Sequence, residues 1–443
     1  SINYISKSTH YFVRAKALQP EYFLPFWDTE AVIPIRPQVF KNYNLKENDI
    51  LISKDSNIGE AIILDKDYPC YMISGALYKL PITKNKFYLF AFLKHNYFRN
   101  QIDLLVPKGS TIRHAKTLFL DCKIPFPNQN NSDDIIKYIE LLTQAIFKKE
   151  KEIKRKNQII FDLIEKELLE NQKNKEFTYS YPKFKDLMNL NRINAGIYSE
   201  YFCQKNFLIK NYKQGYSNVR DLGFDVSRGQ NLQISCIGKS IYSKEYKENF
   251  YTVIKPMHIS VFGTAFSQEY LGSHKKLKTL KAGDIVFGAE GFQKGRSIVI
   301  LKDEDKTITN IHGIIINHVK NNITLSIFVK CFLDYLRTIG LIDLFAVGGN
   351  GGSLAMKYWG VIPIPNFSEP KQKEIAELYH KPPIYPEELN LKNFLVEDSK
   401  WNKQAGIIEI DKSVKKMKDF LNKVLDKIIN NEEVQIDFSF LEQ

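Results

Sequence analysis

The sequence of 443 residues predicts an α+β fold in which two duplicated domains of mixed helices and strands are separated by long antiparallel coiled-coil helices. Three observations predict this fold. Short sequence blocks recur in the same order roughly 240 positions apart, a long segment without proline or glycine follows the first copy, and a second heptad segment follows the second copy. Self-similarity at one long spacing indicates duplicated units of domain size and not short repeats.

The clearest repeat is Ile-Pro-x-Pro-Asn, which occurs at 124–128 and again at 362–366. The blocks before it recur in order: Leu-Lys-x-x-Asp-Ile from Leu45 and Leu280, a glycine at Gly59 and Gly295, ISGALY at 73–78 against IHGIII at 311–316, and Phe-Leu with Ile-Asp-Leu within 91–105 and 331–345. Glu-Tyr-Phe also occurs at 21–23 and 200–202, at a smaller offset. We therefore expect an insertion in the second copy, over roughly 227–260.

The segment after the first copy predicts a long helix with a coiled-coil seam. Four isoleucines recur every seven residues, which is typical of a heptad repeat: Ile139, Ile146, Ile153 and Ile160. Ser132 can cap the start of this helix. Leu142 and Leu163 continue the seam near its ends, but Lys149 and Lys156 stand between them, so we expect looser packing at the centre.

The partner of this helix is expected at the C-terminus, where apolar residues again fall seven apart: Val414, Leu421 and Ile428, with Met417 and Val424 between them. We expect the residues 379–406 to interrupt this second helical region. The predicted organisation is a first domain over 1–132, a spacer helix over 133–176, a second domain over 177–368, and a connector with the second spacer helix over 369–443.

The composition indicates a basic protein with a polyanionic partner. Lysine and arginine number 63 against 50 acidic residues, which gives a net charge of +13, and nucleic acid is the expected partner. The five cysteines form no Cys-x-x-Cys pair, so neither a zinc site nor a disulfide framework is expected, and the predicted location is cytoplasmic. The most apolar stretch is interrupted by charges, which predicts a buried helix and no membrane contact. The chain begins at Ser1 without methionine, as expected of a trimmed or fused chain.

Catalytic machinery is not evident in the sequence. The stretch AVGGNGGSL at 346–354 looks like a phosphate-binding loop, but no Gly-Lys-Ser/Thr follows it, so we interpret it as a flexible loop. Glu304, Asp305 and Lys306 have residue types found in nucleases, but their surroundings indicate a polar turn. We therefore predict a binding subunit and not an enzyme, with no catalytic residue and no metal ligand.

Taken together, these features resemble the specificity (S) subunit of type I restriction-modification systems and the related S modules of type IIB and IIG systems. The resemblance rests on the doubled order of the motifs: Glu-Tyr-Phe, Leu-Lys-x-x-Asp-Ile with its glycine, the loops VPKGST and VGGNGGS, Ile-Pro-x-Pro, and then a long helix. It covers nearly the whole chain, from about Arg14 to the C-terminal helix.

The resemblance implies two target-recognition domains, each reading one half of a bipartite target in double-stranded DNA, held apart by an antiparallel helix pair that measures the unread spacer. It also implies two modification (methyltransferase) subunits as partners, with motor-nuclease subunits joining for cleavage. The modification subunits would bring S-adenosylmethionine, so no cofactor is expected in this chain.

Polar residues on the loops of each copy are the candidates for DNA binding, because Lys and Arg contact phosphates while Asn, Gln, Ser and Arg read base edges. They are Ser53, Lys54, Ser56, Asn57, Arg113 and His114 in the first domain, and Gln293, Lys294, Arg296, Asn350 and Ser353 in the second. A solvated turn is the alternative interpretation of each. A different function also stays open: a non-enzymatic scaffold of a phage-defence complex that binds nucleic acid without sequence preference.

Overall fold

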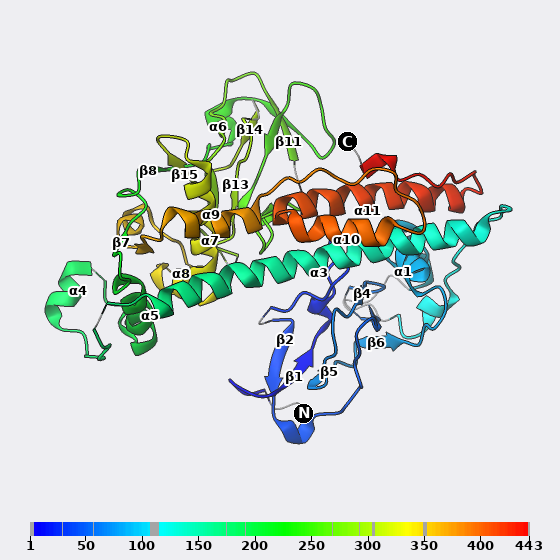
Figure 1. Cartoon of the computed structure of the whole chain (residues 1–443), viewed down its shortest axis with the longest axis horizontal. Helices are drawn as coiled ribbons and strands as arrows, with labels where there is room; N and C mark the ends of the chain where they lie inside the picture. Colours follow the sequence, from blue (N-terminus) through cyan, green and yellow to red (C-terminus); the bar gives the residue numbers. More distant parts are fainter. Residues whose placement is uncertain are drawn as a thin grey trace. The chain divides into compact units, whose positions relative to one another are not determined.

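The computed structural model describes residues 4–28, 30–55, 57–106, 115–173, 175–190, 192–267, 269–291, 293–303, 306–348 and 352–441. The chain divides into two compact units (Figure 1). The first unit combines Ser1–Lys154 with Pro382–Gln443, and the second unit is Arg155–Lys381. The division therefore falls within the long helix α3 (Ser132–Glu170).

The first unit contains two three-stranded sheets. In one sheet β1 lies between β2, which is antiparallel to it, and β5, which is parallel. In the other, β3 lies between β4 and β6, both antiparallel to it. The strands are β1 (His10–Val13), β2 (Val32–Ile35), β3 (Ile50–Ser53), β4 (Ala61–Ile63), β5 (Tyr71–Ile73) and β6 (Leu77–Leu80). Strands β3 and β4 are buried throughout because their sequences, ILIS and AII, are almost entirely aliphatic.

The second unit contains the same two arrangements, each extended by one strand. Strand β10 lies between antiparallel β11 and parallel β14, and β9 is added beyond β11. Strand β12 lies between antiparallel β13 and β15, and β8 is added beyond β15, while β7 and β16 pair separately. The strands are β7 (Tyr216–Ser217), β8 (Phe224–Arg228), β9 (Ser240–Ser243), β10 (Tyr251–Val253), β11 (Glu269–Ser273), β12 (Ile285–Gly288), β13 (Ser297–Val299), β14 (Thr307–Ile308), β15 (Gly313–His318) and β16 (Ile364–Pro365).

This shared topology confirms the predicted duplication. In the first unit Ile50 stands opposite Ile63 on one side and Leu80 on the other, and Ile285 has the same central place in the second unit. Both Leu-Lys-x-x-Asp-Ile motifs therefore lead into the central strand of a sheet, where an aliphatic residue is buried on both faces.

The predicted equivalence of the two Glu-Tyr-Phe blocks is wrong. The first block, 21–23, lies in the connection from β1 to β2, whereas Glu200 begins helix α5 (Glu200–Lys210) well before β10, the counterpart of β1. The predicted insertion over 227–260 is also wrong, because β10 lies inside it. A three-residue match is too short to fix local structure, and the second unit's additional elements lie before β10.

Helices lie at corresponding places after the sheets of each unit. Helices α1 (Lys86–Lys94) and α2 (Asn96–Leu105) follow β6, and α7 (Ile323–Thr338) and α8 (Leu341–Phe345) follow β15. The stretch 323–347 that sequence hydropathy marked as a buried helix is thus α7 and α8, and α7 is almost entirely buried. The remaining helices are α4 (Phe184–Leu190), α5, α6 (Ile234–Ile237), α9 (Glu369–Tyr379), α10 (Phe394–Gln404) and α11 (Ile407–Ile429).

Helix α3 begins at Ser132 as predicted, and it ends at Glu170, before the expected Glu176. The side-chain amide of Asn171 donates to the backbone oxygen of Glu167 at 3.2 Å, which satisfies one carbonyl at the helix end. At ~1.5 Å per residue its 39 residues span ~58 Å. The four heptad isoleucines predicted for the seam are all buried.

Within the first unit, α3 and α11 run antiparallel, as predicted. Near the start of α3, Tyr138 packs edge-on against Phe438 with ring centroids 5.0 Å apart, while Glu150 binds Lys418 at 2.6 Å. Residues later in α3 therefore contact residues earlier in the C-terminal segment, as expected of antiparallel chains. Val414, Leu421 and Ile428 are buried in α11, and residues 380–393 interrupt the C-terminal helical region between α9 and α10.

The expected loose packing around the seam lysines is wrong. Lys149 is 0 % exposed and its ammonium lies 2.7 Å from Asp398 and 2.7 Å from the side-chain oxygen of Asn402. It also lies 4.3 Å from the ring centroid of Trp401, close enough for a cation–π contact. Burial lowers the pKa of Lys149, and Asp398 opposes that shift. Lys156 is also buried. A buried ion pair beside an aromatic ring therefore fills the centre of the seam, where looser packing was expected.

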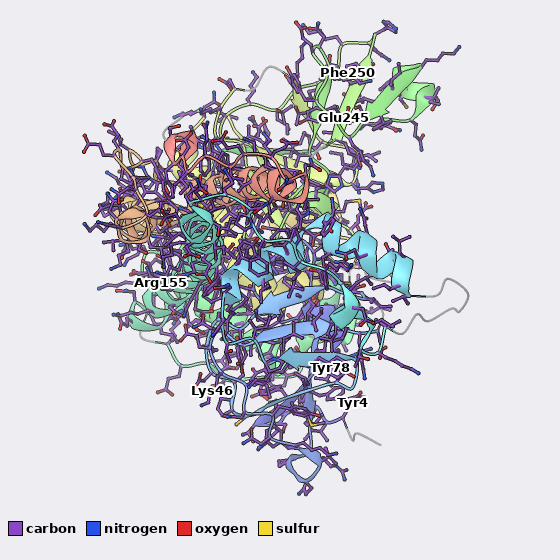
Figure 2. All side chains as sticks on the ribbon, turned by 90° about the vertical axis from the view of Figure 1, so that its right-hand side faces the viewer. Tyr4, Lys46, Tyr78, Arg155, Glu245 and Phe250 are labelled. Atoms are coloured by element: carbon purple, nitrogen blue, oxygen red, sulfur yellow. The ribbon has the colours of Figure 1, made fainter. Side chains whose placement is uncertain are left out.

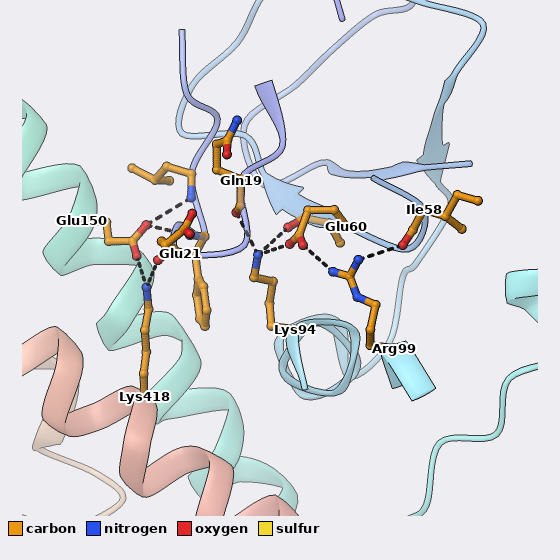
Figure 3. A network of polar contacts seen from close by, with 11 residues as sticks. Gln19, Glu21, Ile58, Glu60, Lys94, Arg99, Glu150 and Lys418 are labelled. Atoms are coloured by element: carbon orange, nitrogen blue, oxygen red, sulfur yellow. Dashed lines mark hydrogen bonds and ion pairs between the residues drawn. The ribbon is translucent and has the colours of Figure 1, made fainter. Parts of the chain in front are cut away.

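The next residue of α3, Glu150, joins the helices to the first domain. One carboxylate oxygen accepts from the backbone amides of Phe23 and Leu24 at 2.8 and 3.1 Å, and the other binds Lys418 (Figure 3). Lys418 also donates to the backbone oxygen of Glu21 at 2.6 Å. The first Glu-Tyr-Phe block thus serves as a docking point between the domain and its helix pair.

We expect Lys149→Met to lower the free energy of unfolding of the first unit by about 3 to 5 kcal/mol, because Asp398 would remain buried without its cation. The control Lys151→Ala removes a half-exposed pair with Glu47 and should cost under ~1 kcal/mol. Urea unfolding measures both. Similar losses in the two variants would contradict the assigned role of Lys149.

A second buried network predicts how stability depends on pH. Glu60 binds Lys94 and Arg99 beneath the β3–β4 connection (Figure 3). Burial alone would raise the pKa of Glu60, but the two cations outweigh it and the pKa lies below its usual value. Such a carboxylate stabilises the fold above its unfolded pKa of ~4.3, and this contribution is lost as the pH falls through the folded pKa.

We therefore expect Glu60→Gln to reduce the loss of stability below about pH 4.3, although the variant is less stable at neutral pH because Lys94 loses its counter-charge. The midpoint of urea unfolding, measured between pH ~3 and ~7, tests this because the range brackets the titration of a carboxyl group. Asp121→Asn, at an exposed position, is the control. Identical pH profiles for the native chain and Glu60→Gln would refute the interpretation.

Candidate nucleic-acid interface

In the second unit, three loops converge, and two of them carry predicted site residues. They are the connection from β12 to β13, the turn before β15, and the segment after α8. The amide of Leu354 donates to the oxygen of Ala289 at 2.9 Å, Gly291 donates to Gly352 at 3.3 Å, and Ala289 donates to His312 at 3.5 Å. We call the three loops the loop interface; they bring Gln293, Lys294, Arg296 and Ser353 to one end of the sheet.

The first unit has the same arrangement. The amide of Ala115 donates to the oxygen of Lys54, and the amide of Lys54 donates to the oxygen of Ala76, both at 2.8 Å. Lys54 therefore has the place of Ala289, between two loops that are distant in sequence. Because the contact pattern is repeated, the duplication extends from the strands to the loops.

A glycine closes the β3–β4 and β12–β13 loops in both units. Gly59 donates to the oxygen of Ser53 at 2.8 Å, and Gly295 donates to the oxygen of Gly288 at 2.7 Å. Both have positive φ, +78° and +85°, and a Cβ would lie 2.5 Å from Ile102 in the first unit and 2.9 Å from Arg337 in the second. The glycine that follows each Leu-Lys-x-x-Asp-Ile motif is thus required by backbone conformation and by close packing.

The predicted residues of the first unit lie in different environments. Ser53 is fully buried and its hydroxyl donates to the backbone oxygen of Asp55 at 2.6 Å, so it holds the loop in shape. Lys54 is half-buried, with its ammonium 4.7 Å from the ring centroid of Tyr78. Asn57 is exposed.

Several of the predicted site residues of the second unit make contacts with other residues of that unit. Gln293 is exposed, and its side-chain oxygen accepts from the Arg296 guanidinium at 3.1 Å. Lys294 is 9 % exposed and pairs with Asp343 at 2.6 Å. Ser353 is half-buried and exchanges both backbone hydrogen bonds with Val347, at 2.8 and 2.9 Å. Gln293 is the most accessible of the four. Ser56, Arg113, His114 and Asn350 lie outside the described residues.

Three charged or titratable residues of the loop interface were missed by the sequence analysis. Arg228, the last residue of β8, lies 3.0 Å from one oxygen of Glu290, and the Nδ1 of His312 lies 2.9 Å from the other. The hydrogen bond with His312 lowers the pKa of Glu290, burial opposes this, and Arg228 adds to the lowering. Arg228 was missed because it is far from these loops in sequence, whereas Glu290 lies only three residues before the predicted Gln293.

This arrangement presents hydrogen-bond donors and acceptors on loops that are joined by backbone hydrogen bonds, which is the chemistry of recognition. Among the described residues, no cluster of three or more His, Cys, Asp or Glu side chains is placed to hold a metal ion. No helix in the described part of the chain is long and apolar enough to cross a membrane.

Residues 14–176 match the family model of the type I restriction modification DNA specificity domain. No curated protein sequence matches the chain significantly.

Among solved structures, the chain is similar to the S subunit of a type I restriction-modification system from M. genitalium, with 12% identity over 98% of this chain and 91% of that one, at a TM-score of 0.41. It is also similar to the HsdS subunit from Thermoanaerobacter tengcongensis, with 11% identity over 95% and 90% of the two chains, at 0.29. A structure described for complex assembly and conformational transition of the type I R-M system gives 10% identity over 95% and 90%, also at 0.29.

These TM-scores are low, so the assignment of residues 14–176 rests on the sequence match, which covers β2 to β6 of the first unit and all of α3. That match agrees with the motifs that carry the resemblance. Residues 14–176 thus match a type I restriction modification DNA specificity domain, the family that the sequence motifs resemble.

Proposed function

We propose that this chain recognises a bipartite sequence in double-stranded DNA, with one half-site read by each unit, and that it directs methylation and restriction by partner subunits. The observation that carries the proposal is the repeated loop convergence, in which Lys54 and Ala289 occupy the same place in two copies of one fold. Two copies of one reading surface suit a target made of two half-sites. The family match supports DNA as the ligand.

The side chains at the loop interface have the chemistry that base reading requires. A guanidinium such as that of Arg228 can donate two hydrogen bonds to guanine, and amides such as those of Asn57 and Gln293 can pair with adenine. Glu290 can accept from the amino group of cytosine. The net charge of +13 would favour contact with phosphates over the whole surface.

The proposed partners are two modification subunits, which would supply S-adenosylmethionine and methylate adenine, with motor-nuclease subunits joining for cleavage. The chain itself would contribute no catalytic group and no cofactor site, and it would act in the cytoplasm. A scaffold without sequence preference would bind all duplexes equally, with or without modification subunits, whereas a specificity subunit would prefer particular sequences and do so more strongly in their presence.

We expect Gln293→Ala to relax discrimination at one base pair of one half-site by about 1 to 3 kcal/mol, because the exposed amide of Gln293 would no longer pair with a base edge. Affinities for duplexes with single-base changes across both half-sites measure this. The control Gln214→Ala removes an equally exposed amide of the same unit. A uniform loss over both half-sites, or no loss, would show that Gln293 does not read sequence.

The helix that links the units predicts the spacer. The test variant carries two insertions at the places where the units divide: seven helical residues between Lys154 and Arg155, and seven flexible residues between Lys381 and Pro382. We expect this variant to prefer a DNA spacer that is longer by ~10 Å, or about three base pairs. Sequencing of methylated sites measures the spacer. The control inserts the same residues in the exposed loop after Tyr43. A spacer unchanged by both insertions would mean that the helix does not measure DNA.

A further inference from the structure

The second unit has a full strand at an edge of its β10 sheet where the first unit has a single β-bridge. Strand β9 borders β11, whereas β2, the counterpart of β11 in the first unit, is bridged at that edge only at Ile35, by Tyr4, among the described residues. Ser240 of β9 stands opposite Ser273 of β11. Residues just before β9 and just after β11 therefore lie at the same end of the ladder.

That end carries exposed lysines. We call the exposed lysines Lys239, Lys275, Lys276 and Lys278 the β9 basic cluster. No acidic residue occurs between Ser273 and Lys281. Lys275 donates to the backbone oxygen of Cys236 at 2.6 Å, which holds the loop against α6, whereas no carboxylate in the described residues lies within ion-pairing distance of Lys239 or Lys276. The charges of Lys239 and Lys276 are thus not neutralised by a paired carboxylate in the described residues, whereas Lys278 acts electrostatically on Asp284.

The β9 basic cluster is continuous with the loop interface. The backbone amide of Lys278 donates to the side-chain oxygen of Gln230 at 3.2 Å, and the amide of Gln230 donates to the oxygen of Thr309 at 2.9 Å. Gln230 stands two residues after Arg228, which pairs with Glu290. The chain from β8 to α6 therefore leads from the reading loops to the lysines within a few residues.

Exposed apolar side chains accompany the lysines. Ile234, at the start of α6, is 70 % exposed, and Ile241 of β9 is 64 % exposed. Figure 2 labels Glu245 and Phe250 in the connection from β9 to β10, which leaves β9 at the end of the ladder opposite to Lys239. Lysines beside apolar groups suit a nucleic-acid backbone, where phosphates alternate with sugars.

We propose that the β9 basic cluster grips the phosphate backbone of duplex DNA immediately outside the half-site read by the second unit. The inference rests on the proposed function for the neighbouring loops and adds a second, sequence-independent contact to it. The proposal concerns the half-site of the second unit, because the first unit has only the bridge between Tyr4 and Ile35 at the corresponding edge among its described residues.

The test replaces Lys239, Lys276 and Lys278 with glutamine in the full chain, and leaves Lys275 in place because it holds the loop. The probe is a random-sequence duplex about four helical turns long, so no knowledge of the target is needed. Each phosphate contact contributes about 0.9 to the slope of log affinity against log salt. We expect the slope to fall by about 2 to 3 and affinity at low salt to fall about tenfold or more.

Two matched variants make the result specific. The first control variant removes the same charge from exposed positions of the same unit by three substitutions, Lys183→Gln, Lys185→Gln and Lys213→Gln. It should leave the slope of log affinity against log salt within about one phosphate contact of the native value. Lys→Arg at the three cluster positions should restore the native slope. Equal salt slopes for the cluster variant and its charge-matched control would overturn the proposal. It would also be overturned if the cluster variant changed self-association while the salt slope of its DNA binding stayed native.

Base preference separates this inference from the proposed function. If the native chain shows no preference among duplexes, the proposed function fails, while the salt slopes still report on the cluster. If base preference is present and the cluster variant keeps both it and the native slope, only the further inference fails.

Discussion

The first unit depends on two consecutive residues of one helix. Lys149 binds Asp398 of α10, and Glu150 binds Lys418 of α11 and the amides of Phe23 and Leu24. The domain and both C-terminal helices are thus fixed to the same turn of α3. Burial of charge costs several kcal/mol unless partners are well placed, so these contacts specify one arrangement as well as stabilising it.

A second constraint acts on the loop interface of the second unit and on the matching loops of the first unit, which are proposed to read DNA. Each unit builds its sheet around one aliphatic strand, β3 or β12, and then returns the chain through a glycine of positive φ packed against a helix side chain. The loops are therefore held by backbone hydrogen bonds to one another, while residues such as Asn57 and Gln293 stay exposed. Changing these side chains would alter recognition without altering the scaffold, which is the property that a specificity subunit needs.

Much of the fold could be predicted from sequence because duplication and heptad spacing are strong signals. The seam of Ile139 to Ile160, the start at Ser132 and the central strands after each Leu-Lys-x-x-Asp-Ile motif were predicted in this way. The environment of Lys149 could not be predicted, because its partners lie in α10, far away in sequence and outside any heptad pattern. The Glu-Tyr-Phe alignment failed because three residues carry too little information to distinguish a turn from a helix start.

The candidate site was predicted less well. Sequence indicated which loops matter, and the structure brings those loops together, but Arg228 reaches Glu290 from another strand and only the fold reveals it. Burial likewise separates Ser53 and Lys294 from the exposed Gln293, a distinction that letters alone do not make.

The central claim is that two copies of one reading surface recognise two half-sites. Selection of bound duplexes from a random-sequence library, by the full chain together with the proposed modification subunits, tests this most directly. The account predicts a motif of two short conserved blocks separated by a gap of fixed length and no sequence preference. A single uninterrupted motif, or a selected pool with no motif, would contradict it.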